Sequence, residues 1–164
     1  MAPHSLTHQS KSCREAESPI LVACRRARRV AVVILDEHEV IDVYRMKLPR
    51  SAPAARGRAI RRAIVQLSTD YGVGHIAVED DAYLGALLAC AGRPLRLMSH
   101  KTAASVLLGT KTASRSDLFR HVLAQHPKLH RFVTVMRATG ASGEERWRTL
   151  VLLATALGMA SISL

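Results

Sequence analysis

Aromatic residues are scarce in this sequence of 164 residues. Phenylalanine, tyrosine and tryptophan together make up 4% of it, with a single Trp. Proteins that hold single strands of nucleic acid by stacking bases present aromatic side chains along a groove. The composition therefore argues against a stacking platform for single strands.

Cysteine is also rare. The chain has three cysteines, Cys13, Cys24 and Cys90. An odd number at such wide spacing suits neither a disulfide framework nor a zinc motif. This pattern is typical of a reducing compartment, and we expect a cytoplasmic protein.

Long apolar runs are missing as well. No run approaches the roughly 20 residues of a membrane span, so we expect no contact with a membrane. The first stretch, MAPHSLTHQSKSCREAES, has no apolar centre and carries Glu15 and Glu17, unlike signal or transit peptides. We expect residues 1–18 to be a disordered tail and residues 19–164 to form a single domain.

Acidic residues are outnumbered by basic ones. The chain has 24 Lys and Arg against 13 Asp and Glu, a net charge of +11. Such an excess favours polyanions, because neutralised phosphates release counterions. A biased coding composition also produces arginine-rich chains. We expect a nucleic-acid partner, with DNA favoured over RNA.

Apolar patterning predicts three strands at the start of the domain. Ile20–Cys24 is wholly apolar, Arg29–Leu35 is rich in valine and isoleucine, and Val40–Leu48 alternates. The connections are short, and short connections join antiparallel neighbours. The chain therefore begins with an antiparallel meander.

Helices and two more strands follow. Residues 75–80 and 94–100 read as strands, and helices are predicted within 55–72, 81–92, 101–109 and 110–127. One more helical or extended piece is expected at 128–139. The final helix has an apolar seam of Trp147, Leu150, Val151, Ala154, Leu157 and Gly158. This order predicts an α/β, ribonuclease H-like fold: the meander is extended by parallel strands into a five-stranded mixed sheet with flanking helices.

Within that fold the sequence resembles the RuvC-like Holliday-junction resolvases over roughly residues 20–160. ILVACRRARRVAVVILD is similar to the family's opening strand, turn and strand, with Cys24 where the family has Asp. HIAVED is similar to the segment around the family's second acid and keeps Glu79. Lys101, Gly109, Lys111 and Ala113 match a later family segment. ERWRTLV aligns with the acidic pair of the last helix, with Glu145 at the first acid and Arg148 at the second.

The resemblance implies a nuclease site with two divalent metal ions, Mg²⁺ or Mn²⁺, held by carboxylates. Glu79 and Glu145 are the remnants of that site, and they are the expected metal ligands only if the protein is active. Cys24 and Arg148 stand at positions of lost acids, where a soft thiol and a cation suit Mg²⁺ poorly. We therefore expect a degenerate active site and no cofactor.

Simpler explanations exist for the same residues. Cys24 can be a small buried hydrophobe, or a thiol whose pKa is lowered by Arg25 and Arg26. Glu145 can close a capping box with Ser142, and Asp80 or Asp81 can cap the helix that follows. Among the other acids, Asp36 is expected at the opposite sheet edge from Cys24, and Asp42 is expected to face solvent.

Basic residues near the family site are the candidate phosphate contacts. They lie in the first turn, in the segment after the fifth strand and at the start of the last helix, and the resemblance implies that these groups converge. The nucleic-acid-binding residues expected are Arg25, Arg26, Arg28, Lys101, Lys111, Arg115, Arg146 and Arg148. Another cluster, at 56–62, can be a solvated helix face.

Three functions remain open on the sequence alone. The first is binding of nucleic acid, including branched DNA, by a RuvC-like domain that has lost most metal-ligand acids. The second is a Mg²⁺- or Mn²⁺-dependent, structure-selective endonuclease built on Glu79, Glu145 and a neighbouring Asp. The third is a protein-interaction or dimerisation module that uses the apolar final helix and its ASISL end. A homodimer is compatible with all three.

Overall fold

The computed structural model describes residues 18–130 and 142–164, with side chains from Glu145 onward in the second stretch. Most of the expected tail and most of the piece predicted at 128–139 lie outside the described residues. The side chain of Ser142, and with it the predicted capping box, also lies outside them. The domain boundary placed at residue 18 stays a prediction.

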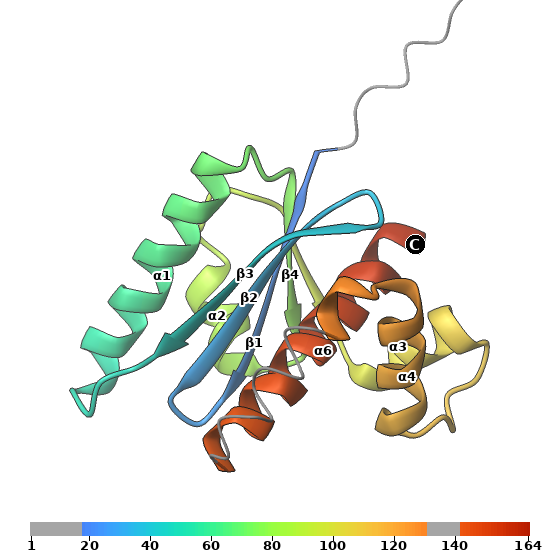
Figure 1. The fold of residues 1–164 in the computed structure, drawn as a ribbon. Helices are drawn as coiled ribbons and strands as arrows, with labels where there is room; N and C mark the ends of the chain where they lie inside the picture. Colours follow the sequence, from blue (N-terminus) through green and yellow to red (C-terminus); the bar gives the residue numbers. More distant parts are fainter. Residues whose placement is uncertain (1–17, 131–141) are drawn as a thin grey trace, which may run out of the picture.

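Five strands form one mixed sheet, as the sequence predicted. They are β1 (Ile20–Arg26), β2 (Arg29–Asp36), β3 (Glu39–Lys47), β4 (His75–Glu79) and β5 (Leu95–Met98). Their order across the sheet is β3-β2-β1-β4-β5. The meander β1–β2–β3 is antiparallel, whereas β4 pairs in parallel with β1 and β5 in parallel with β4. This arrangement confirms the predicted ribonuclease H-like fold (Figure 1).

The first hairpin turn is shorter than the sequence suggested. Arg25 and Arg26 belong to β1, and Arg26 pairs with Arg29, so the turn consists of two residues. Ala27 takes a positive φ of 52° there, a conformation more usual for glycine. Because side chains alternate along a strand, Arg25 and Arg26 point to opposite faces of the sheet.

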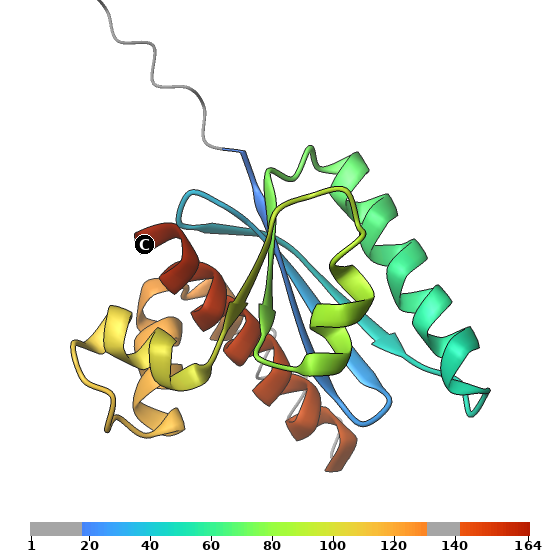
Figure 2. The same cartoon turned by 180° about the vertical axis from the view of Figure 1, so that it is seen from behind.

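Helices α1 (Pro53–Asp70) and α2 (Ala82–Leu88) cover one face of the sheet (Figure 2). Ile60 and Ile64 of α1 are fully buried there, so these two residues attach the helix to the sheet. Asp42, expected to face solvent, lies partly buried on this side. Its carboxylate accepts hydrogen bonds from the hydroxyls of Tyr71 (2.6 Å) and Tyr44 (2.9 Å), which lowers its pKa.

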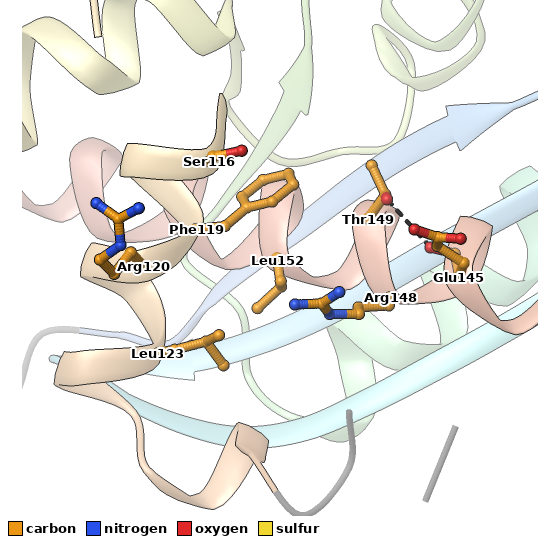
Figure 3. A pocket seen from close by; sticks show the side chains of 8 residues that line it. All are labelled: Ser116, Phe119, Arg120, Leu123, Glu145, Arg148, Thr149 and Leu152. Carbon is orange, nitrogen blue, oxygen red and sulfur yellow. Dashed lines mark hydrogen bonds between the residues drawn. The ribbon is translucent and has the colours of Figure 1, made fainter. Parts of the chain in front are cut away.

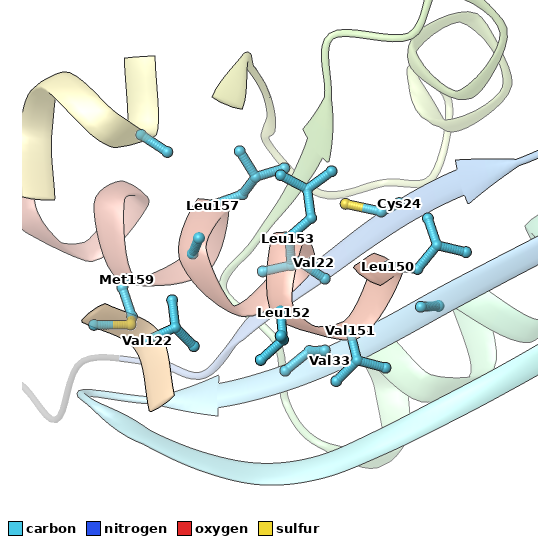
Figure 4. Packing of buried hydrophobic residues seen from close by; sticks show 14 of the residues in the cluster. Val22, Cys24, Val33, Val122, Leu150, Val151, Leu152, Leu153, Leu157 and Met159 are labelled. Atoms are coloured by element: carbon cyan, nitrogen blue, oxygen red, sulfur yellow. The ribbon is translucent and has the colours of Figure 1, made fainter. Parts of the chain in front are cut away.

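The other face carries the long final helix, α6 (Ser142–Ser163). Helices α3 (His100–Leu108) and α4 (Arg115–Gln125) pack against the outer side of α6, which therefore lies between them and the sheet. The predicted seam is buried, and so are Leu152 and Ala156 on the far side of the helix (Figure 4). This burial removes the apolar helix as a surface for a partner. None of the described helices is long and apolar enough to cross a membrane.

Gly158 lets α6 approach the sheet closely. A Cβ at this position would clash with Leu35 and would lie 2.9 Å from Cγ2 of Val22. Both side chains are fully buried, so neither has free space into which to move.

Candidate functional site

The carboxyl ends of β1 and β4 lie side by side at the centre of the sheet. From β1 the chain runs to β2 and β3 on one side, and it later returns to place β4 and β5 on the other. Ligands of open α/β sheets bind outside the strand ends at such a reversal. We call the residues gathered there the strand-end site: Cys24, Arg25 and Arg26 of β1, Glu79 of β4, and Asp81 just after it.

Arg26 and Glu79 form the centre of this site. One guanidinium nitrogen of Arg26 donates to Oε1 of Glu79 at 2.6 Å, and the other makes a shorter contact with Oε2. Fork-to-fork pairing of this kind is among the stronger hydrogen-bonded arrangements in proteins. It raises the pKa of Arg26 further. Glu79 is only 8% exposed, so its carboxylate is both paired and nearly sealed from solvent.

Cys24 is a buried apolar residue, as one of the two simpler explanations predicted. Its side chain has no exposed surface and belongs to the cluster that packs under α6. Burial raises the pKa of the thiol strongly, and the neighbouring Glu79 carboxylate adds to the effect. The nearby Arg26 opposes this shift without overcoming it. The alternative of a thiol activated by arginine is therefore wrong.

Arg25 is paired on the opposite face of the sheet. Its guanidinium lies 3.0 Å from the carboxylate of Asp81 and 4.7 Å from the ring centre of Tyr83. The same carboxylate caps α2, accepting from the backbone N–H groups of Tyr83 (2.8 Å) and Leu84 (3.2 Å). This confirms the predicted cap at Asp81.

The donor set of the strand-end site does not fit a magnesium ion in this arrangement. Mg²⁺ needs several hard oxygen ligands in near-octahedral geometry. Here both Glu79 oxygens are held by Arg26, Asp81 is held by Arg25 and by α2, and Cys24 offers a neutral thiol. Across residues 18–130 and 142–164, no three His, Cys, Asp or Glu side chains are grouped as metal ligands.

Glu145 and Arg148 of α6 face α4. Both line a cavity of about 420 Å³ between α4 and α6, together with Ser116, Phe119, Arg120, Leu123, Thr149 and Leu152 (Figure 3). Cys24 instead packs on the sheet side of α6, in the same buried cluster as Leu150 (Figure 4). The described side-chain hydrogen bonds of Glu79 go to Arg26, and none joins Glu79 to Glu145 or Arg148.

The predicted phosphate contacts divide into paired and exposed residues. Arg25 and Arg26 are ion-paired, and Arg28 donates to the backbone oxygen of Leu48 at 3.5 Å. Four of the others are exposed: Lys101, Lys111, Arg115 and Arg146. The β1–β2 turn, the end of β5 and the starts of α4 and α6 all lie toward the lower side of the molecule in Figures 1 and 2. The segments that carry the predicted phosphate contacts therefore lie on one side of the molecule, although they are spread widely across that side.

Sequence reasoning missed a cationic group beside this site. The guanidinium carbons of Arg29 and Arg45 each lie 6.0 Å from the ring centre of Trp147. Arg45 pairs with Ala31, and Lys47 pairs with Arg29, in the β2–β3 ladder. We call Trp147, Arg29, Arg45 and Lys47 the Trp147 cluster. The available signal was the alternation of β3, which puts Val43, Arg45 and Lys47 on one face.

The strand order and the flanking helices are those of the ribonuclease H-like fold, and the chain shares this fold with RuvC. Similar solved structures include RuvC of Thermus thermophilus, with a TM-score of 0.64 and 14% identity, covering 87% of this chain and 92% of that chain. They also include T. thermophilus RuvC in complex with a Holliday junction substrate, with a TM-score of 0.63, 12% identity and the same coverage. No protein-family model and no curated protein sequence matches the chain. The likeness confirms the predicted fold.

Proposed function

We propose that this protein binds nucleic acid, with DNA favoured, through the sugar-phosphate backbone and without two-metal cleavage. The observation that carries the proposal is the Arg26–Glu79 pair. The resemblance implies an acid at position 79, and Glu79 is present there. The guanidinium of Arg26 holds both oxygens of its carboxylate. Where the implied nuclease site would hold metal ions, the guanidinium of Arg26 balances the charge of the carboxylate.

Charge supports the same proposal. The net charge is +11, and exposed Lys101, Lys111, Arg115 and Arg146 lie on the strand-end side of the fold. Phosphate contacts from such side chains position a protein on nucleic acid without reading its sequence. Branched DNA is the first ligand to test, because one of the similar structures is RuvC in complex with a Holliday junction substrate.

A binding and cleavage assay tests the proposal. A labelled four-way junction and a matching duplex are titrated with protein at several salt concentrations, with Mg²⁺ and with Mn²⁺. We expect binding that weakens linearly with the logarithm of salt concentration, and intact DNA. Cleavage that Glu79→Gln abolishes would establish the endonuclease alternative instead.

Two triple variants with equal loss of charge locate the surface. Lys101→Gln, Lys111→Gln and Arg115→Gln together are expected to weaken binding and to flatten the salt dependence. The control is Arg58→Gln, Arg61→Gln and Arg62→Gln on α1, which packs on the other face of the sheet. Equal losses in the two variants would count against a defined surface. The homodimer and the cytoplasmic location stay predictions.

A further inference from the structure

Helices α4 and α6 enclose the cavity shown in Figure 3, which the proposed function does not use. Its volume of about 420 Å³ lies within the range of sites for small organic molecules. Such sites occur between packed helices and combine apolar walls with a few polar groups. The cavity between α4 and α6 has both of these elements.

One part of the cavity wall is apolar. Phe119 and Leu123 come from α4, and Leu152 comes from α6. Phe119 and Leu123 are partly buried, whereas Leu152 is fully buried. An aromatic ring beside two leucines suits the hydrocarbon part of a ligand, because moving apolar surface out of water is favourable.

Arg148 supplies a cation in the same cavity. Figure 3 shows its guanidinium pointing from α6 toward α4. Its Nε atom is buried and has no hydrogen-bond acceptor, and no ion pair holds the group within the described part of the chain. A buried N–H group without an acceptor is costly. A carboxylate or a phosphate would supply two oxygens that match the guanidinium fork.

The other charged groups of the cavity determine where an anion fits. Arg120 is paired with Asp117 at 3.2 Å, and Glu145 lies at the opposite end of the cavity from Arg120. The Glu145 carboxylate repels an anion, so we expect a bound acid on the side of Arg148 that faces α4.

We propose that this cavity binds a small amphipathic acid. Arg148 contacts its carboxylate or phosphate group, and Phe119, Leu123 and Leu152 contact its hydrocarbon part. The proposal does not depend on nucleic-acid binding. It gives Arg148 a different ligand from the nucleic-acid phosphate that the resemblance implied.

Nuclear magnetic resonance tests the proposal directly, because the Nε–H group of Arg148 has its own signal. The isotopically labelled full chain is titrated with phenylacetate and with phenyl phosphate, which carry the two acidic groups. We expect saturable shifts of the Arg148 Nε–H signal and of the Phe119 signals, with a dissociation constant of about 1 mM for molecules of this size. The acid that binds more tightly identifies the preferred head group.

Two further compounds serve as controls. Phenylethanol keeps the ring and lacks the charge, whereas acetate keeps the charge and lacks the ring. Both should bind at least about tenfold more weakly than phenylacetate, because each loses one of the two kinds of contact.

Matched variants identify the residues. Arg148→Gln should weaken phenylacetate binding at least about tenfold, and Arg148→Lys, which keeps the charge and loses the fork, should be intermediate. Arg146→Gln removes the same charge from an exposed residue of α6 outside the cavity, and it should change the affinity by less than about twofold. Glu145→Gln should strengthen binding, because it removes the opposing carboxylate.

Three outcomes would overturn the proposal. The first is a set of shifts that do not saturate, or equal affinities for phenylacetate and phenylethanol. The second is equal weakening by Arg148→Gln and Arg146→Gln, which would indicate general attraction to a positively charged protein. The third is a shift of the Arg148 signal by a four-way junction and by neither acid, which would assign the residue to nucleic acid. A failure to bind nucleic acid would overturn the proposed function alone.

Discussion

Arg26, the last residue of β1, reaches across to Glu79, the last residue of β4, and binds both oxygens of its carboxylate. The two strands are parallel neighbours, and their ladder ends one residue before Glu79, at the pair Ala23–Val78. The ion pair therefore continues the contact between the strands beyond their last paired residues. It also neutralises the Glu79 carboxylate at the centre of the strand-end site without a metal ion.

Removing one partner of this pair should destabilise the fold. Arg26→Gln leaves the Glu79 carboxylate 8% exposed and without its bidentate donor. We expect a loss of about 1–3 kcal/mol in the free energy of unfolding, at the lower end of buried-pair effects because Arg26 is partly exposed. Denaturant unfolding measures it.

A double-mutant cycle provides the control for that loss. Glu79→Gln combined with Arg26→Gln removes the uncompensated charge, so the double variant should be more stable than the sum of the two single changes predicts. Strict additivity would show that the pair contributes no coupling energy.

Two substitutions together should create a metal site at the strand ends. Cys24→Asp adds a carboxylate on β1 beside Glu79, and Arg26→Ala releases Glu79. We expect Mn²⁺ to raise the melting temperature of this double variant, because only the metal-bound folded state gains binding energy. Wild type and the single Cys24→Asp variant, in which Arg26 still holds Glu79, serve as controls. Equal Mn²⁺ responses in all three proteins would contradict the role assigned to Arg26.

Gly158 should tolerate no side chain. Gly158→Ala puts a methyl group against Leu35 and Val22, which are fully buried. Overpacking of this kind costs about 1–3 kcal/mol. Thermal or denaturant unfolding measures the change, with Ser163→Ala near the exposed end of the same helix as a control. A change within about 0.5 kcal/mol, as expected at surface positions, would show that α6 can shift away from the sheet.

Stability should fall as the solution becomes mildly acidic. Burial lowers the pKa of His75 and of His126 in the folded state, so the unfolded chain binds their protons more readily. The stabilising contribution of the neutral rings is complete above the unfolded pKa of about 6.5, and it is lost progressively below that pH. Denaturant unfolding at pH 7.5 and at pH 5.5, each value held to about 0.1, should show the decline.

Replacing both histidines tests the cause. A His75→Asn, His126→Asn variant should lose less stability between the two pH values than wild type, whatever its stability at the higher pH. An unchanged decline would assign the effect to other groups. A separate loss at more acidic pH is expected from Asp42 and Asp117, whose pKa values are lowered by their hydrogen bonds.

The fold could be predicted because its strands and its final helix carry clear apolar periods. The turn at Ala27 could not, because alanine gives no signal for a positive φ, and Arg25 and Arg26 were therefore placed in a loop. Residues 150–161 of α6 are all buried, which is more than the predicted seam. Only the packing of α3 and α4 against its outer side explains it.

The candidate site was predicted less completely. Glu79 and Cys24 lie together as expected, since each directly follows the last paired residues, Ala23 and Val78, of two neighbouring parallel strands. Arg148 directly follows Trp147 of the buried seam. Successive side chains on an α-helix differ by more than a quarter turn, so Arg148 points into the cavity beside α4. The pKa of the Cys24 thiol depends on whether burial or the nearby Arg26 dominates, and the full burial of the side chain, which the sequence does not give, decides it.

The Arg26–Glu79 pair also removes the need for a divalent metal ion to balance the charge of Glu79. The positive charge that balances the β4 carboxylate is covalently part of the chain, so dialysis or a chelator cannot withdraw it. We therefore expect the order of the strand ends to be independent of the supply of divalent ions. The same sheet would keep its charge pattern from magnesium-rich to magnesium-starved conditions.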